Sequence, residues 1–188
     1  MALSVAFLLS RRHLWAPAVA DLDLARVLPN PEAHPFPHWL PTRWWPTWAL
    51  AVPTWTPDGR MGGFRFRRVD GGRKRKELPH LGRSGGLVLA CPVALDLLRG
   101  TPDRAVWDGT VLLVEGVPDF MTWATVPGVP RPAVFGIFQG AWTAEHAARI
   151  PDGTRVAVGT HNDPQGNHYA DALAATLAPR CPCFRVRP

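Results

Sequence analysis

The second half of this 188-residue chain alternates short apolar runs with helix-like segments, and this alternation is what most constrains the fold. The apolar runs that are typical of buried strands cover 110–114, 133–138, 154–159 and 184–186. The helix-like segments between them cover 118–125, 143–149 and 167–177. Strands that alternate with helices at this spacing form parallel sheets through right-handed crossovers. We therefore predict an α/β domain over residues 110–188, with a parallel sheet of about four strands flanked by helices.

Residues 49–109 have a different pattern, which predicts a smaller α+β subdomain. In the segment Gly62–Val69, Phe64 and Phe66 alternate with arginines, as expected for a half-exposed strand. Turn signals at 57–59 and 70–72 flank this strand, and 49–52 is a plausible partner strand. A short strand at 87–90 and a short helix at 92–98 complete the predicted subdomain.

The first 48 residues are predicted to be an N-terminal helix and a connector. Helices are expected at 3–15 and 21–27, whereas the proline density of 28–48 forbids a long regular element. Six of the nine tryptophans precede residue 60. The favoured interpretation is that those of the connector pack beneath an ordered loop, and the alternative is that they stack on nucleic-acid bases.

The positive charge is concentrated in one segment of the chain. The net charge is +6, and residues 60–83 contain nine basic residues against only two acidic ones. Such a concentration predicts a face that binds a polyanion. The basic residues are Arg60, Arg65, Arg67, Arg68, Arg73, Lys74, Arg75, Lys76 and Arg83. For the run 73–76, a solvated hairpin is the alternative interpretation.

Cysteine usage and hydropathy predict a cytoplasmic protein that does not span a membrane. The three cysteines form neither a zinc motif nor a disulfide framework, so reduced thiols are expected. No apolar stretch approaches the roughly 18 residues that cross a bilayer. Residues 1–10 lack a basic start and a convincing cleavage site, so we predict an amphipathic helix there rather than a signal peptide.

Carboxylates follow two of the predicted strands. Glu115 ends the first strand, Asp119 comes four residues later, and Asp163 follows the third strand. Because the carboxyl ends of parallel strands meet at one sheet edge, we expect these acids to converge. Oxygen donors of this kind suit Mg²⁺ or Mn²⁺, which keep waters and take phosphate ligands. Alternatively, Asp163 caps the last helix and Asp119 is an acid favoured by the helix dipole.

Two motifs resemble the signature of the Toprim (topoisomerase–primase) domain. They are Glu115-Gly116-Val117-Pro118-Asp119 and, about 45 residues later, His161-Asn162-Asp163-Pro164-Gln165-Gly166. Upstream, Val52-Pro53 and the segment 58–64 with Arg67 resemble the basic subdomain that precedes Toprim in bacterial, phage and plasmid DNA primases. The resemblance covers roughly residues 49–188.

This resemblance implies template-directed primer synthesis on single-stranded DNA during DNA replication, by nucleotidyl transfer with Mg²⁺ or Mn²⁺. It assigns Glu115 as general acid or base, and Asp119 and Asp163 as metal ligands. The basic residues would contact template phosphates. Nucleotides would be substrates, and a replicative helicase or a separate zinc-binding module would be a partner.

His161 departs from the family pattern, because it stands where the family has the first Asp of an Asp-x-Asp pair. A neutral imidazole is a poor ligand for Mg²⁺, suits a transition metal better, and brings no negative charge. We keep His161 as a candidate metal ligand. Three functions therefore remain open: a primase-type enzyme, a non-catalytic nucleic-acid-binding protein with a degenerate site, and a Toprim nuclease.

Overall fold

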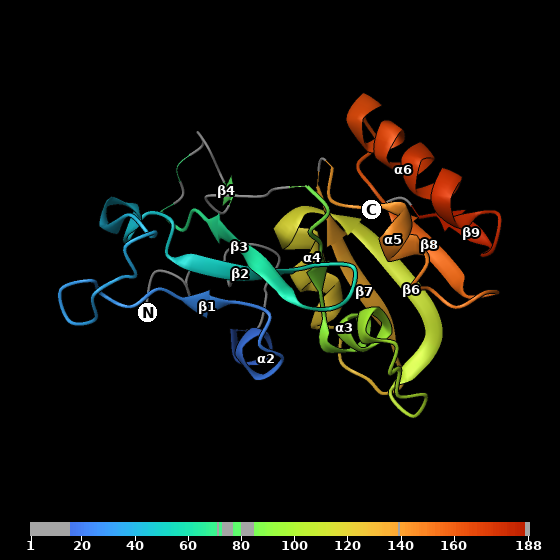
Figure 1. Cartoon of the computed structure of the whole chain (residues 1–188), viewed down its shortest axis with the longest axis horizontal. Helices are drawn as coiled ribbons and strands as arrows, with labels where there is room; N and C mark the ends of the chain where they lie inside the picture. Colours follow the sequence, from blue (N-terminus) through green and yellow to red (C-terminus); the bar gives the residue numbers. More distant parts are fainter. Residues whose placement is uncertain (1–15, 71, 73–76, 80–84, 139, 187–188) are drawn as a thin grey trace.

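The chain folds into two β-sheets that lie side by side (Figure 1). The computed structural model describes residues 16–70, 72, 77–79, 85–138 and 140–186. The first sheet has the order β1-β2-β3-β4, with strands Arg26–Val27, Leu50–Trp55, Met61–Arg67 and Glu77–Pro79. The second has the order β5-β7-β6-β8-β9, with strands Leu89–Ala90, Arg131–Ile137, Trp107–Glu115, Arg155–Gly159 and Cys183–Arg185. The predicted helix at 3–15 lies outside the described residues.

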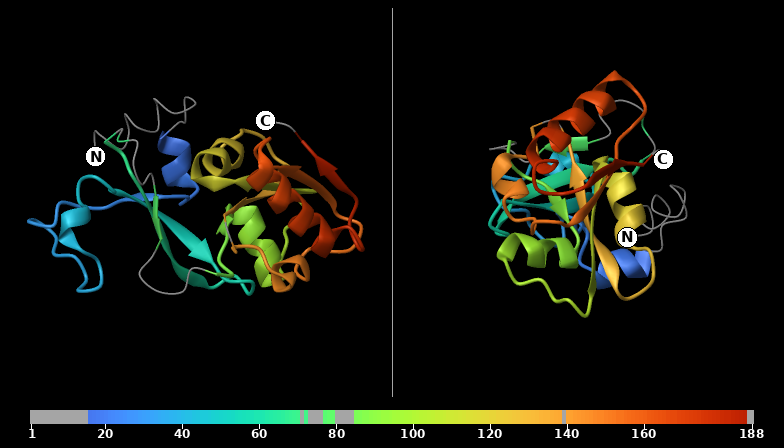
Figure 2. Two further views of the ribbon diagram at one scale, coloured as in Figure 1. Left: turned by 90° about the horizontal axis from the view of Figure 1, so that it is seen from above. Right: turned by 90° about the vertical axis from the view of Figure 1, so that its right-hand side faces the viewer.

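The second sheet confirms the predicted α/β architecture. Strand β6 pairs in parallel with both β7 and β8, and β9 is parallel to β8. The antiparallel edge strand β5 is an addition to the four predicted parallel strands. The crossover helices are α4 (Gly116–Ala124), α5 (Ala144–Ala147) and α6 (Pro164–Leu177). Right-handed crossovers require α4 on one face and α5 and α6 on the other, as Figure 2 shows.

The predicted helix over 21–27 is wrong. Helix α2 (Ala16–Asp21) ends where that helix was expected to begin, and β1 pairs with β2 instead. Asp23 has a positive φ of 50°, which ends helical geometry, and its carboxylate binds the guanidinium of Arg26 at 2.8 Å. Strand pairing with a distant segment therefore overrides the local pattern. Helices α4 and α6 also begin two and three residues earlier than predicted.

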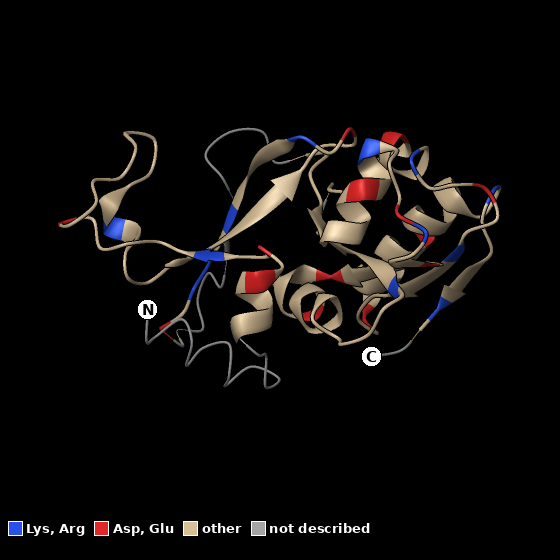
Figure 3. Cartoon of the chain, turned by 90° about the horizontal axis from the view of Figure 1, so that it is seen from below, with Lys and Arg blue, Asp and Glu red and all other residues tan. Residues whose placement is uncertain are grey.

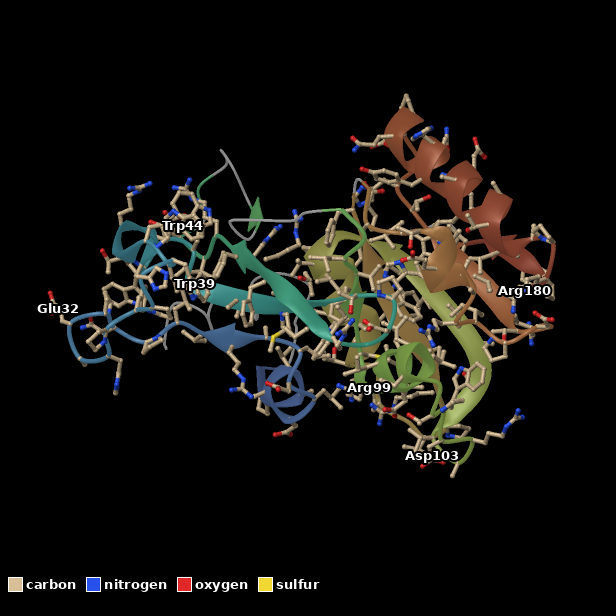
Figure 4. All side chains as sticks on the ribbon, viewed as in Figure 1. Glu32, Trp39, Trp44, Arg99, Asp103 and Arg180 are labelled. Carbon is tan, nitrogen blue, oxygen red and sulfur yellow. The ribbon has the colours of Figure 1, made fainter. Side chains whose placement is uncertain are left out.

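The proline-rich connector packs against the first sheet and carries a short 3-10 helix (Thr42–Trp44). Trp44 is 9% exposed, and its ring meets Phe66 edge-on at 5.2 Å, in a cluster that also contains Leu40 and Ala51. The packing interpretation is confirmed for Trp44. Trp39 remains 37% exposed, and Figure 4 shows both tryptophans far from Arg180 at the opposite end of the molecule.

Contacts between the ends of β2 and β5 join the two sheets. Trp55 forms an antiparallel bridge with Val88. Nearby, Arg99 at the end of α3 (Pro92–Arg99) donates through Nε to the carbonyl of Gly59 at 3.3 Å (Figure 4). Strand β5 belongs to the second sheet, and helix α3 packs against that sheet. Both elements lie within the predicted subdomain 49–109. The subdomain boundaries themselves stay predictions. None of the helices among the described residues combines the length and the hydrophobicity that a membrane span needs.

His146 on α5 is fully buried and titrates abnormally. Its Nδ1 accepts a hydrogen bond from the backbone N–H of Thr143 at 3.2 Å, and its ring stacks on Trp142 at 5.3 Å. Burial lowers the pKa of His146 to about 4. Protonation would also convert Nδ1 from an acceptor into a donor and break the hydrogen bond to Thr143.

We expect the free energy of unfolding to fall as the pH drops from about 6.5 to about 4. In this range the unfolded chain binds a proton at His146 and the folded chain does not, so protonation favours unfolding. The full loss is about 3 kcal/mol, at roughly 1.4 kcal/mol per pKa unit. Urea unfolding across this range measures it. His146→Gln retains a hydrogen-bond acceptor at the helix start and does not titrate, so its stability should vary much less over these pH values; the same slope in both proteins would contradict this assignment.

Candidate functional site

A hollow of about 350 Å³ lies at the carboxyl ends of β6 and β7, where α4 begins. It contains three of the four predicted catalytic or metal-binding residues, namely Glu115, Asp119 and His161. The described residues that line it are Arg67, Glu115, Gly116, Pro118, Asp119, Ile137, Phe138, His161, Gln165 and Tyr169. The expected convergence of the three acids is therefore present for Glu115 and Asp119 but not for Asp163, and His161 lies beside the two acids instead.

Two local features place the acids of α4. Glu115 is the last residue of β6, and Gly116 follows it with a φ of +77°, a backbone conformation that side-chain-bearing residues rarely adopt. This left-handed residue turns the chain from strand to helix within one residue. Asp119 then falls in the first turn of α4 and is only 5% exposed. The Glu-Gly-x-x-Asp spacing thus directs both carboxylates to one hollow.

His161 lies between the two carboxylates. Its Nδ1 is 3.5 Å from Oε2 of Glu115, and its Nε2 is 3.4 Å from Oδ2 of Asp119. The backbone N–H of His161 also donates to Oε2 of Glu115 at 3.2 Å. The imidazole is about half exposed, in contrast to the two acids. One ring therefore approaches both acids, and its backbone fixes the orientation of one of them.

The loop 160–166 is held by contacts that do not involve the imidazole of His161. Thr160 Oγ1 donates to the carbonyl of Gly166 at 2.8 Å, and Asp163 Oδ1 accepts from the N–H of Gly166 at 2.7 Å. A Cβ on Gly166 would collide with the carbonyl oxygen of His161. Arg185 on β9 donates to that same carbonyl at 3.0 Å. Glycine is therefore required at 166 for the loop to close.

Asp163 does not line the hollow. Its side chain caps α6 through the hydrogen bond to Gly166, which is the alternative that the sequence left open. Its role as a metal ligand stays a prediction.

The predicted nucleic-acid-binding residues fall into separate environments. Arg67 is 8% exposed and lines the hollow, and the guanidinium of Arg65 lies 3.9 Å from the ring centroid of Phe138. Arg60 pairs with Asp58 at 2.6 Å, and Arg68 pairs with Asp70 at 2.5 Å. Arg73, Lys74, Arg75, Lys76 and Arg83 lie outside the described residues.

The two acids that pair with these arginines remain charged at neutral pH. Hydrogen bonds from Thr56 Oγ1 and from the guanidinium of Arg60 lower the pKa of Asp58 to about 2, and those from Arg68 and the N–H of Gly72 lower the pKa of Asp70 to about 2. Each pair is locally neutral. The charged residues of strands β1 to β3 are all arginines, whereas both signs mix over the other half of the molecule (Figure 3).

Three uncharged side chains of the hollow were missed by the sequence analysis: Phe138, Gln165 and Tyr169. Gln165 Nε2 donates to the hydroxyl of Tyr169 at 2.7 Å, one turn apart on α6. Gln165 belongs to the second motif, and its i, i+4 spacing to Tyr169 was a detectable signal. Phe138 directly follows β7 and had no such signal.

The donor set suits a divalent ion that is held partly by phosphates. Within the described residues, no three acidic, histidine or cysteine side chains are arranged as a ready metal cage. The hollow instead offers two carboxylates, which is how proteins commonly hold Mg²⁺ together with waters and substrate phosphates. The adjacent imidazole adds a donor that Mn²⁺ accepts more readily than Mg²⁺ does.

The fold is similar to that of primase catalytic cores. No protein-family model matches the sequence, and no curated protein matches it. The structure is similar to that of a DnaG primase catalytic domain bound to single-stranded DNA, with a TM-score of 0.64, 17% identity and coverage of 98% of this chain and 64% of that one.

Two further solved structures give the same result. The E. coli primase catalytic core has a TM-score of 0.61 and 17% identity, with 98% of this chain and 65% of that chain covered. The zinc-binding and RNA polymerase domains of the Aquifex aeolicus primase have a TM-score of 0.63 and 15% identity, with 98% and 49% covered. The chain thus spans about half to two thirds of the length of these structures, and at this identity the similarity shows the fold alone.

We predict that Asp163 is needed for stability through its side-chain oxygen and not through its charge. Asp163→Ala should lower the free energy of unfolding by about 1 kcal/mol, because the N–H of Gly166 loses its acceptor. Asp163→Asn keeps an acceptor and should stay within a few tenths of a kcal/mol of the wild type. Chemical denaturation without divalent metal measures both, and equal losses would refute the capping role. Mn²⁺ titration of the same variants tests the predicted ligand role.

Proposed function

We propose that this protein is a Toprim-type nucleotidyltransferase that synthesises primers on single-stranded DNA with Mg²⁺ or Mn²⁺. The single observation that carries the proposal is the approach of Glu115, Asp119 and His161 to one another beside Arg67, in a hollow of a primase-like fold. The hollow contains both carboxylates for metal and proton chemistry and a guanidinium for phosphate charge. The DNA that is bound in the similar primase structure supports the choice of a DNA template.

Primer extension makes one bond and breaks one. The 3′-hydroxyl of the primer attacks the α-phosphorus of the incoming nucleotide, the bond to the β-phosphate breaks, and pyrophosphate leaves. Glu115 accepts the hydroxyl proton as general base, and the N–H of His161 at 3.2 Å orients the carboxylate that does so. Arg67 faces the phosphates from the first sheet. A divalent ion held by Asp119 would supply neutralisation of phosphate charge.

The arginine-bearing side of the first sheet is the proposed path of the template. Arg65 sits over Phe138 at the rim of the hollow, so a strand that passes it also passes the carboxylates. Protein contacts to phosphates bind DNA without sequence preference, and this binding weakens as the salt concentration rises. Arg60 and Arg68 contribute less to template binding than two isolated positive charges would, because each is paired with an aspartate.

A non-catalytic DNA-binding protein is the second candidate, and the position of His161 is what favours it. The imidazole approaches both carboxylates, which is where an ion would have to bind. A protein that retained the fold and the arginines but lost the metal would bind DNA and synthesise nothing. A nuclease would cut labelled DNA in the same metal-containing buffers.

Glu115→Gln should abolish primer synthesis, because an amide of the same shape cannot accept the hydroxyl proton. We expect a loss of at least 100-fold, as is typical for a general base, with DNA affinity changed less than about twofold. Primer synthesis is measured by the incorporation of labelled nucleotides on single-stranded DNA, in Mg²⁺ and Mn²⁺ separately. DNA affinity is measured by binding at a series of salt concentrations. Glu145→Gln, the same change at an exposed position of α5 outside the hollow, is the matched control. Wild-type protein that binds DNA without synthesis in either metal would establish the second candidate.

His161→Asp should tighten divalent metal binding by about tenfold or more, equivalent to about 1.4 kcal/mol. The substitution removes the ring that contacts both carboxylates and adds a third oxygen donor. The gain should be larger for Mg²⁺ than for Mn²⁺, because imidazole is the poorer ligand for Mg²⁺. Calorimetric titration with each ion measures it. His168→Asp, the same change at an exposed position of α6, is the control. An unchanged metal affinity in His161→Asp would refute metal binding at this loop.

A further inference from the structure

The connector 28–48 contains an aromatic surface that has no role in the chemistry proposed above. Four tryptophans and six prolines occur within this segment. Trp44 is buried against the first sheet, whereas Trp39 is 37% exposed. A ring of this size gains a large hydrophobic free energy when it is covered. A tryptophan that stays at the surface is therefore a candidate contact for a ligand.

The backbone around Trp39 is fixed by its neighbours in the chain. The N–H of Leu40 donates to the carbonyl of Pro37 at 2.9 Å, which closes a turn that contains Trp39. The proline ring restricts φ at the start of this turn. The side chain of Leu40 is buried in the same cluster as Trp44 and Phe66. Trp39 can therefore bind a ligand without first having to order its own backbone.

Positive charge accompanies this aromatic surface. Arg43 is exposed on the 3-10 helix that follows Trp39, and the guanidinium of Arg68 lies 5.5 Å from the ring centroid of Trp48. Glu32 is the only acidic residue in the sequence of the connector, and Figure 4 shows it at the outer end of the connector, away from Trp39. Proteins bind single-stranded nucleic acids on surfaces of this kind, where aromatic rings stack with bases and positive charges contact phosphates.

The connector is attached to the strand that supplies Arg67 to the hollow. On β3, Phe66 meets Trp44 of the connector edge-on at 5.2 Å, and the adjacent Arg67 lines the hollow. Successive side chains of a strand point to opposite faces of its sheet. Beyond the end of β3, the N–H of Val69 donates to the carbonyl of Thr47 at 2.8 Å. A nucleic-acid strand that leaves the hollow past the end of β3 therefore reaches the connector.

We propose that the exposed ring of Trp39 stacks with an unpaired base of single-stranded DNA, so that the connector extends the DNA-binding surface beyond the hollow. The inference goes beyond the proposed function and rests on it only for the route of the DNA strand. The stacked base lies outside the hollow, and the template bases at the carboxylates stay free to pair with nucleotides. Because every base has a flat π face, the contact adds affinity without sequence preference.

Substitutions at position 39 test the proposal. Trp39→Ala removes the ring, and Trp39→Phe keeps a smaller one. Trp123→Ala, the same change at a ring that is 45% exposed on α4, is the matched control. The probes are an oligo-dT strand and a strand of the same length in which every base is replaced by an abasic site. Fluorescence anisotropy of the labelled strands at a series of salt concentrations measures the affinities, and thermal unfolding shows that each variant is folded.

Trp39→Ala should bind the oligo-dT strand about fivefold more weakly than the wild type, or weaker still. Its affinity for the abasic strand and the salt dependence of binding should be unchanged, because the ring contributes stacking and no charge. Trp39→Phe should retain most of the oligo-dT affinity, and Trp123→Ala should retain all of it. Equal oligo-dT affinity in the wild type and Trp39→Ala overturns the proposal. An equal loss for both strands, an equal loss in Trp123→Ala, or a wild type that does not prefer oligo-dT to the abasic strand also overturns it.

The outcome is separable from the proposed function. If the wild type makes no primer but Trp39→Ala shows the selective loss of oligo-dT affinity, the enzyme activity fails and the stacking contact stands. If the wild type makes primers and Trp39→Ala binds both strands as the wild type does, the stacking contact fails and the enzyme activity stands.

Discussion

The pairing of β6 with a parallel neighbour on each side is the constraint on which the rest of the structure depends. Val111 is in register with Ala133 of β7 and with Val156 of β8, and all three are completely buried. Both faces of this strand are buried over Val111–Val114, so a slip of one residue would exchange the side chains that pack on the two sides of the sheet. The same ladders bring Glu115 level with Ile137 at the end of β7. The packing of the core therefore also determines where the carboxylate of Glu115 lies.

Much of the second sheet could be predicted because its information is local. Strand-length apolar runs such as 110–114 and the helix-like segments between them identify parallel strands, and the topology then brings Glu115, Asp119 and His161 to one edge. Segment 21–27 could not be predicted, because its conformation depends on pairing with residues 50 and 51, far along the chain. Arg67 was expected to contact DNA, but its place in the hollow depends on how two sheets pack together. No periodicity in the sequence encodes that packing.

The ring contacts of His161 were also beyond sequence reasoning. The substitution is visible as an imidazole at a position where the resemblance implies an acid, but the sequence does not give the path of the loop. In the structure both ring nitrogens face carboxylates, from distances of 3.4 and 3.5 Å. The capping role of Asp163 was open at that stage for a similar reason, since a residue that directly precedes a helix suits a cap and a ligand equally well.

The closed loop 160–166 has a consequence for how this fold changes its chemistry. The backbone of the loop is fixed by Thr160, Asp163 and Gly166, and Arg185 binds it from the edge strand. The imidazole at position 161 is about half exposed and takes no part in these hydrogen bonds. A substitution at position 161 can therefore replace an acidic side chain with a basic one while the loop keeps its shape. The metal preference of the site can in this way change through one side chain, because the backbone of the loop does not depend on that side chain.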